Sequence, residues 1–133
     1  MNNQVKIFLS IIGLLILGTI AAVLLQPKST PAAPGKYEAL AQCIKDSGAT
    51  FYGAFWCPHC QAEEADFQMT RQALAAIGLY TECSTADGTA QTQVCIDKKI
   101  QSYPTWVFKD GSTLTGTIPL AQLAQKTGCT VPQ

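Results

Sequence analysis

The strongest constraint on the fold is a pair of cysteines placed between a strand pattern and a helix pattern. Residues 49–56, "ATFYGAFW", form a short apolar and aromatic run that is typical of a buried strand. Cys57-Pro58-His59-Cys60 follows at once. Residues 61–77 are then rich in Ala, Glu, Gln and Leu and contain no Pro or Gly, which predicts a helix ended by Gly78. The two cysteines therefore stand where a strand turns into a helix.

The rest of the chain continues an alternation of helices and strands. A β-α-β unit requires a parallel strand pair with a right-handed crossover, and Asp110-Gly111 is a strong signal for a later antiparallel hairpin. We therefore expect an α/β fold with one mixed sheet, helices on both faces, and a domain over residues 37–130. The expected helices are 37–47, 90–100 and 119–127, and the expected further strands are 79–83, 105–110 and 112–117. In the first of these helices Leu40, Cys43 and Ile44 share one face, and in the second Val94, Cys95 and Ile100 are expected to point inward. In strand 105–110, Trp106 and Phe108 lie on one face and Val107 on the other.

An uncharged apolar run precedes this domain. Residues 7–25 span about nineteen positions, which at about 1.5 Å per residue nearly cross a hydrocarbon core of about 30 Å. We expect a transmembrane anchor after a short cytoplasmic tail over 1–6. A cleaved signal peptide and a buried core helix are the alternatives, although the run is long for a signal peptide and ends at a poor cleavage site. Residues 26–36 hold three prolines and read as an extended linker.

Charge and cysteine content narrow the function. Nine basic and nine acidic residues cancel, so the sequence does not indicate a nucleic-acid partner. Six cysteines in 133 residues indicate disulfides in an exported domain, or metal binding and catalysis in a cytosolic one. Positive charges on the two sides of the apolar run nearly balance and leave its topology open. From the cysteines we expect the domain outside the cytoplasmic membrane, on the periplasmic side.

The cysteine pair itself has the pattern of a redox couple. Free N–H groups and the dipole at a helix start stabilise negative charge, so Cys57 is predicted to be the exposed attacking thiolate. Pro58 suits the first helical turn, and Cys60 lies one turn on as the buried resolving thiol. His59 is expected to be exposed beside them and, when protonated, to favour the thiolate further.

Metal binding is the competing interpretation. A C-x-x-C pair can be half of a zinc site, but a closed site needs four ligands, and the sequence has neither a second C-x-x-C nor a histidine besides His59. A soft-metal carrier using Cys57, Cys60 and His59 stays open as a non-enzyme alternative. C-x-x-C at a strand-to-helix junction is the more specific redox signal. We predict no metal and no organic cofactor for the domain.

The segments "FYGAFWCPHC", "YPT" and the final β-β-α pattern resemble the thioredoxin superfamily from residue 37 to 129. The resemblance implies a thioredoxin-like fold in which Pro104 is cis and faces the cysteine pair, although a simple turn proline is the alternative. It also implies that Trp56, Tyr103 and Thr105 border the substrate, which is bound by backbone beside the proline.

The Pro-His dipeptide resembles the DsbA family of oxidising bacterial enzymes. A stabilised thiolate there implies a disulfide that is readily donated. One departure concerns proton transfer, because these families carry a buried acid six residues before the first cysteine and this chain has Phe51. Glu63 and Glu64 follow the cysteines in the same helix and are interpreted as a solvated face rather than as a substitute.

A further resemblance is to thioredoxin-like domains fused to, or paired with, bacterial and plant vitamin K epoxide reductase homologues. It implies a bond between Cys83 and Cys95, with a structural role or a relay role. Cys43 and Cys129 have no counterpart there; we expect them to pair, with free buried thiols as the alternative. This chain has one apolar span, so a quinone-reducing partner is a separate membrane protein.

The sequence thus predicts a membrane-anchored thiol–disulfide oxidoreductase. The expected direction is oxidation of cysteine-containing exported proteins, with reoxidation by a vitamin K epoxide reductase-like membrane protein. A reductase or isomerase, for instance one serving cytochrome c maturation, is the alternative enzyme.

Overall fold

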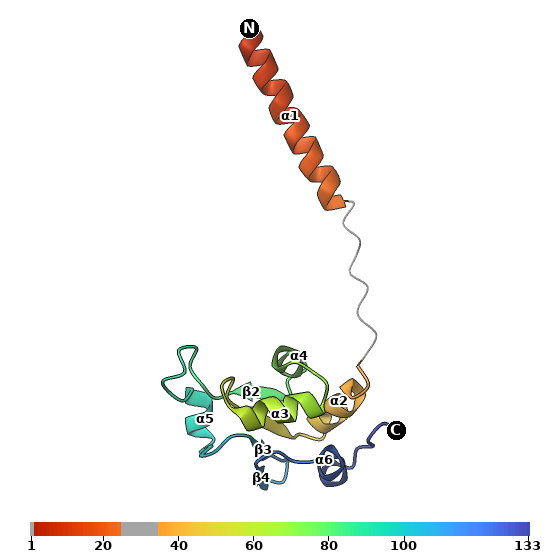
Figure 1. The fold of residues 1–133 in the computed structure, drawn as a ribbon, viewed down its shortest axis with the longest axis vertical. Helices are drawn as coiled ribbons and strands as arrows, with labels where there is room; N and C mark the ends of the chain where they lie inside the picture. Colours follow the sequence, from red (N-terminus) through yellow and green to blue (C-terminus); the bar gives the residue numbers. More distant parts are fainter. Residues whose placement is uncertain (1, 25–34) are drawn as a thin grey trace. The chain divides into compact units, whose positions relative to one another are not determined.

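The computed structural model describes residues 2–24 and 35–133, which fall in two separate units (Figure 1). The first is a single helix, α1 (Asn3–Leu24). Its segment Asn3–Ala21 is long and apolar enough to cross a membrane, and none of it is buried against other parts of the protein. The helix is consistent with a single-pass anchor, and it starts four residues before the expected span. The predicted linker, 26–36, lies almost entirely outside the described residues.

The second unit is built on a four-stranded mixed sheet with the order β2-β1-β3-β4. Strand β1 (Thr50–Gly53) runs parallel to β2 (Tyr80–Glu82) and antiparallel to β3 (Thr105–Val107). The hairpin partner of β3 is β4 (Thr113–Thr115). The predicted parallel pair and the predicted late hairpin are both confirmed.

Helices pack around this sheet (Figure 1), and side chains on and next to them cover both of its faces. The first and the last helix of the unit follow their predicted ranges closely. Each is followed by a glycine with positive φ, Gly48 after the first and Gly128 after the last. The helices are α2 (Glu38–Asp46), α3 (Pro58–Asp66), α4 (Arg71–Ala76), α5 (Gln93–Asp97) and α6 (Leu120–Thr127).

The single helix predicted over 61–77 is wrong, because the chain forms α3 and α4 with a break between them. Phe67 is fully buried, and Gln68 next to it adopts φ 52°, which no helix can continue. The Thr70 hydroxyl then accepts a hydrogen bond from the Ala73 N–H at 3.2 Å and caps the new helix. The break turns α4 so that Leu74 also packs into the core.

The predicted helix over 90–100 is also shorter than expected. It is helical only over α5, and Val94 is exposed rather than inward. Cys95 and Ile100 are buried as predicted. Val94 is exposed because the Cys83–Cys95 disulfide holds the Cys95 face of α5 against the sheet, and the adjacent Val94 then points away from it.

The two faces of the sheet carry two hydrophobic clusters. On one face Phe51, Trp106 and Leu114 stand opposite one another on neighbouring strands, and the Phe51 ring stacks on Trp106 at 5.1 Å between centroids. Tyr52 and Val107 point to the other face, as the alternation of a strand requires. The first face is covered by side chains of α2, α4 and α6 and by Phe67 between α3 and α4, namely Leu40, Ile44, Phe67, Leu74 and Leu123. The second face is covered by Cys95 of α5 and by Ile100, which follows that helix.

Two disulfides close the fold. Cys83, just after β2, bonds to Cys95 in α5, and Cys43 in α2 bonds to Cys129, which follows the end of α6. Both are the pairings expected from the sequence. The second bond ties the first helix of the unit to its C-terminal end.

Candidate active site

The end of β1 delivers the first cysteine to the start of a helix. After the buried Ala54 the chain turns, and the Cys57 N–H donates to the Ala54 carbonyl at 3.0 Å. Cys57 is the N-cap of α3, with extended backbone, and its own carbonyl accepts from the Gln61 N–H. Pro58 is the first helical residue, where a missing N–H costs nothing. The N-terminus of α3 therefore lies directly after Cys57.

Both cysteines of the pair are free thiols, and both are buried. Cys60 is 0% exposed, as predicted, but Cys57 is only 5% exposed, so its predicted exposure is wrong. The cause is the loop before β3: the Cys57 thiol donates to the Tyr103 carbonyl at 3.6 Å, and this loop covers it. Only a narrow part of Cys57 is open to an incoming sulfur.

The covering loop contains the cis peptide bond predicted at Pro104, between Tyr103 and Pro104. Pro104 is fully buried, and the Tyr103 carbonyl that precedes it faces the Cys57 sulfur. The structure thus brings residues 57 and 103–104 together although 46 positions separate Cys57 from Tyr103.

Aromatic side chains form the rim of the site. Trp56 is 50% exposed and meets the Tyr103 ring edge-on at 6.0 Å between centroids. Its indole N–H donates to the Ser84 hydroxyl at 2.9 Å, while the Tyr103 hydroxyl accepts from the Gln91 amide at 2.7 Å. The rim is therefore held in place on both sides. Its role in binding substrate stays a prediction.

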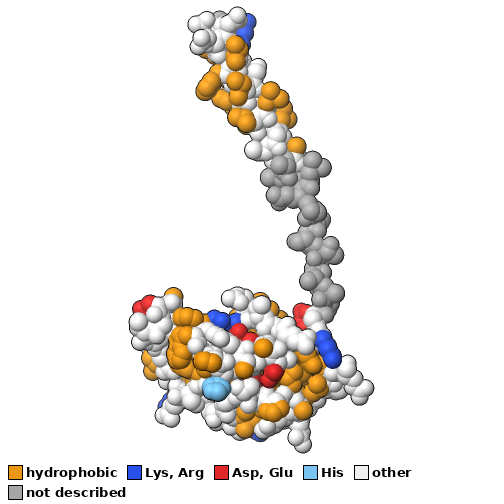
Figure 2. All heavy atoms as spheres, viewed as in Figure 1, with side chains coloured by type: hydrophobic (Ala, Val, Ile, Leu, Met, Phe, Trp, Pro, Cys, Tyr) orange, Lys and Arg blue, Asp and Glu red, His pale blue; other side chains and the backbone are white. Residues whose placement is uncertain are grey.

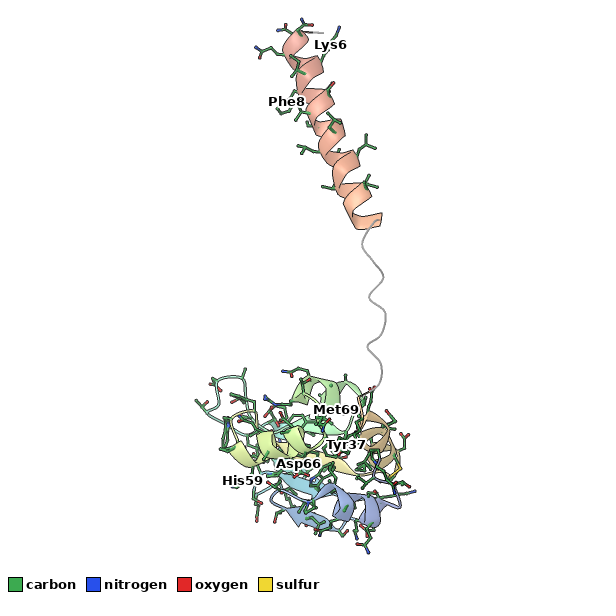
Figure 3. All side chains as sticks on the ribbon, turned by 45° about the vertical axis from the view of Figure 1, so that its right-hand side comes forward. Lys6, Phe8, Tyr37, His59, Asp66 and Met69 are labelled. Carbon is green, nitrogen blue, oxygen red and sulfur yellow. A yellow bond between two sulfur atoms is a disulfide. The ribbon has the colours of Figure 1, made fainter. Side chains whose placement is uncertain are left out.

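Thr105 and His59 occupy opposite environments. Thr105 is buried, and its hydroxyl donates to the Ser102 carbonyl at 2.7 Å, which leaves its backbone rather than its side chain for contacts in β3. His59 is exposed on α3, as Figure 3 shows, and the His side chain in Figure 2 lies open on the surface with hydrophobic side chains around it.

Glu63 is not part of a solvated face, so that interpretation of the sequence is wrong. The side chain is fully buried between α3, β3 and the segment before α6. Its two carboxylate oxygens accept from the Trp106 indole N–H at 3.1 Å and the Ile118 N–H at 2.8 Å. Burial raises the pKa of Glu63 to about 7, against the two hydrogen bonds, which act in the other direction.

Glu64 is also buried, with 9% exposed, and here too the predicted solvation is wrong. One of its oxygens accepts from the Arg71 Nε at 3.1 Å. The same guanidinium lies 3.8 Å from an oxygen of Glu82, and that carboxylate also accepts from the Tyr80 hydroxyl at 2.9 Å. We call Glu64, Arg71, Glu82 and Tyr80 the carboxylate cluster.

The helical period could have revealed both acids from the sequence. Residues three and four positions after a buried helical residue lie on its face, and Cys60 was predicted to be buried. Arg71, Tyr80 and Glu82 carried no such signal, because their approach to Glu64 depends on the break between α3 and α4.

Burial raises the pKa of the Cys60 thiol well above its ordinary value. The neighbouring Cys57 thiol and the Glu64 carboxylate act in the same direction, and a hydrogen bond with the Ala54 backbone opposes them. Cys60 is therefore held as a neutral thiol beneath Cys57. One outer and one inner sulfur, with the Tyr103 carbonyl beside the outer one, form an arrangement suited to exchanging a disulfide with another chain.

The sequence model of the thioredoxin family matches residues 36–127 of the chain. Among curated proteins, the chain is similar to the thiol-disulfide oxidoreductase LTO1 of Arabidopsis thaliana, with 39% identity over 98 residues. The match covers 71% of this chain and 25% of the Arabidopsis protein, so the chain spans about a quarter of the length of that relative.

Proposed function

The chain belongs to the thioredoxin family, and we propose that within it the chain is a disulfide oxidase for exported proteins. Its Cys-X-X-Cys pair at the start of α3 makes it a thiol–disulfide oxidoreductase, the activity that the name of its Arabidopsis relative also states. The direction, the substrates and the partner are the proposed part.

The proposed reaction starts from the Cys57–Cys60 disulfide. A substrate thiolate attacks the Cys57 sulfur, the bond to Cys60 breaks, and Cys60 leaves with the electron pair and takes up a proton. A second substrate thiolate then attacks the substrate sulfur of the mixed disulfide. The substrate leaves with a disulfide, and Cys57 and Cys60 are left reduced.

The observation that carries this proposal is the unequal burial of the two sulfurs. Cys60 is fully enclosed, so an incoming chain reaches Cys57, beside which the Tyr103 carbonyl and the exposed Trp56 ring lie. A substrate backbone N–H has an acceptor there, and Trp56 offers an apolar contact. We propose that Trp56, Tyr103 and the backbone of Thr105 border the bound substrate.

The oxidising direction is supported by the residues between the cysteines. His59 is exposed in the first turn of α3, where its imidazolium form would stabilise a Cys57 thiolate together with the helix dipole. Stabilising the reduced form makes the disulfide a stronger oxidant.

We further propose that α1 anchors the protein in the cytoplasmic membrane with the second unit outside. Its segment Asn3–Ala21 is long and apolar enough to cross a membrane, and the disulfides Cys43–Cys129 and Cys83–Cys95 suit an oxidising compartment. Reoxidation is assigned to the disulfide of a separate quinone-reducing membrane protein of the vitamin K epoxide reductase type.

Two measurements test the function. A Cys60→Ala variant expressed in cells should trap mixed disulfides through Cys57 with exported cysteine-containing proteins and with one membrane oxidase. The reduction potential of the pair should lie well above that of thioredoxin, about −270 mV, and towards that of DsbA, about −120 mV. A thioredoxin-like potential, or trapping only of haem-attachment proteins, would show a reductase instead.

A further inference from the structure

The carboxylate cluster lies beside the resolving thiol. Glu64 is four residues after Cys60 on α3, so the two side chains share one helical face, and both are buried. The Tyr80 ring approaches from β2: Tyr80 Cε2 and the Cys60 sulfur lie 2.8 and 3.0 Å from the point where a Cβ on Gly53 would stand. The absence of a side chain at Gly53 lets these groups meet.

The cluster carries more negative than positive charge. Glu64 and Glu82 share the single guanidinium of Arg71, at 3.1 and 3.8 Å. Glu82 has three further donors, because the N–H groups of Phe55 and Ser84 and the Tyr80 hydroxyl all point to its oxygens. Glu64 has Arg71 alone among the described residues, and it is the carboxylate on the helix of Cys60.

The other ionisable groups near Cys60 do not offset this charge. Cys57 precedes it on the chain, Glu63 lies on the same helix, and Tyr80 reaches it from β2. His59, its neighbour on α3, is exposed to solvent, where its charge is screened from the buried sulfur. Cys57, Glu63 and Tyr80 are each neutral or negative. Arg71 of α4 is the one cation in this cluster, and it is already engaged by two carboxylates. A thiolate on Cys60 would therefore form next to uncompensated negative charge in a poorly solvated place.

We propose that the Glu64 carboxylate keeps the Cys60 thiol protonated while Cys57 holds a substrate, and thereby prolongs the mixed disulfide. The mixed disulfide has two outcomes. In the first, Cys60 loses its proton and its thiolate attacks the Cys57 sulfur; the bond from Cys57 to the substrate breaks, and the substrate leaves reduced as a thiolate that takes up the proton. In the second, another substrate thiol attacks and the substrate leaves oxidised.

Slowing the first outcome favours the second. Glu64 thus acts through Cys60 and does not itself touch the substrate. The positive charge of Arg71 limits how strongly Glu64 disfavours the Cys60 thiolate. The link to substrate oxidation rests on the oxidase function proposed above, whereas the effect of Glu64 on Cys60 holds for either direction of the reaction.

The test measures the attack by Cys60 directly. The full-length reduced chain in detergent is mixed with glutathione disulfide. The glutathione disulfide is present at concentrations so high that the rate of Cys57–Cys60 disulfide formation no longer depends on them. That limiting rate reports the attack of Cys60 on the Cys57–glutathione bond. Glu64→Gln, which keeps an oxygen for Arg71, should raise the rate about tenfold between pH 6 and 8. Asp66→Asn removes the same charge from the exposed end of α3 and should leave the rate within about twofold.

Arg71→Met gives the opposite sign. It leaves Glu64 without its cation, so the attack by Cys60 should become several-fold slower, whereas general loosening of the site would make both variants faster. An unchanged or slower rate in Glu64→Gln, or a faster rate in Arg71→Met, would overturn the proposal. If Glu64→Gln does not fold, Arg71→Met decides alone. The reduction potential tests the oxidase function separately, so either proposal can fail without the other.

Discussion

The indole N–H of Trp106 donates to the buried carboxylate of Glu63 at 3.1 Å. Trp106 lies two residues after the cis proline, and Glu63 lies three residues after Cys60. The bond therefore joins the strand that follows the proline loop to the helix that carries both cysteines. Its strength bears directly on how firmly the two halves of the active site are held together.

Glu63 should make the stability of the domain depend on pH. Its pKa is about 7 in the folded chain, against an ordinary value of 4.5, so the folded state binds more protons between these values. The free energy of unfolding should then fall as pH rises from about 4.5 to about 7, by on the order of 3 kcal/mol from this group, and level off above. Urea unfolding of the full-length chain in detergent across this range measures the slope.

Glu63→Gln is the control for that slope. The amide cannot take up the proton, so this part of the pH dependence should disappear. The variant should nevertheless be less stable than the parent at pH 5, because its NH₂ must face the donor of either Trp106 or Ile118. A slope that survives in Glu63→Gln would show that another group is responsible.

Trp106→Phe should destabilise the domain by about 1–3 kcal/mol beyond the loss of ring area, because one oxygen of a buried carboxylate loses its donor. The same loss should move the upper end of the pH slope to higher pH, since the charged form of Glu63 is then stabilised only by the Ile118 N–H. Denaturation curves at pH 5 and pH 8 distinguish this from a packing effect alone, which would lower both curves equally.

Much of this fold could be predicted from the sequence because its local signals agree with one another. The apolar run before Cys57, the Asp110-Gly111 turn and the glycines that end helices each specify one feature, and each was found in place. The break at Gln68 could not be predicted, because it has no Pro or Gly. It results from burying Phe67 and Leu74 in the same core, which is a tertiary effect.

The sequence indicated the part of the candidate site that has a characteristic motif, and it did not indicate the acidic residues that are buried. Cys57, Cys60 and Pro104 stand in a recognisable pattern, and their approach to one another follows from the fold. Glu63 and Glu64 were interpreted by charge rather than by helical period. The burial of Glu63 requires partners from β3 and the segment before α6, which are far away in the sequence, and that of Glu64 requires Arg71, which only the break between α3 and α4 brings onto it.

Gly53→Ala should disturb the packing around the Cys60 sulfur. A Cβ at this position would stand 2.8 Å from Tyr80 Cε2 and 3.0 Å from the Cys60 sulfur, so one of these groups must move. The expected cost is about 1–3 kcal/mol of unfolding free energy in the reduced protein. Adding Tyr80→Leu removes the closest ring atom and should recover part of the loss. If the double variant is as unstable as the sum of the two single variants, the two positions are not coupled as this contact requires.

The Cys43–Cys129 bond should contribute more stability than the exposed position of Cys43 suggests. It closes a loop of 86 residues, whereas Cys83–Cys95 closes one of 12. In the chain-entropy model the longer loop is worth about 4–5 kcal/mol and the shorter about 3 kcal/mol. Replacing both Cys43 and Cys129 by Ala leaves no core cavity at Cys43, which lies on the surface of α2, and removes only the sulfur at Cys129, which is half-buried against the core. The loss therefore measures mainly the constraint on the unfolded chain. Urea unfolding without reductant should show a loss of about 4 kcal/mol with the Cys57–Cys60 pair intact; a loss below about 1 kcal/mol would contradict the entropic origin.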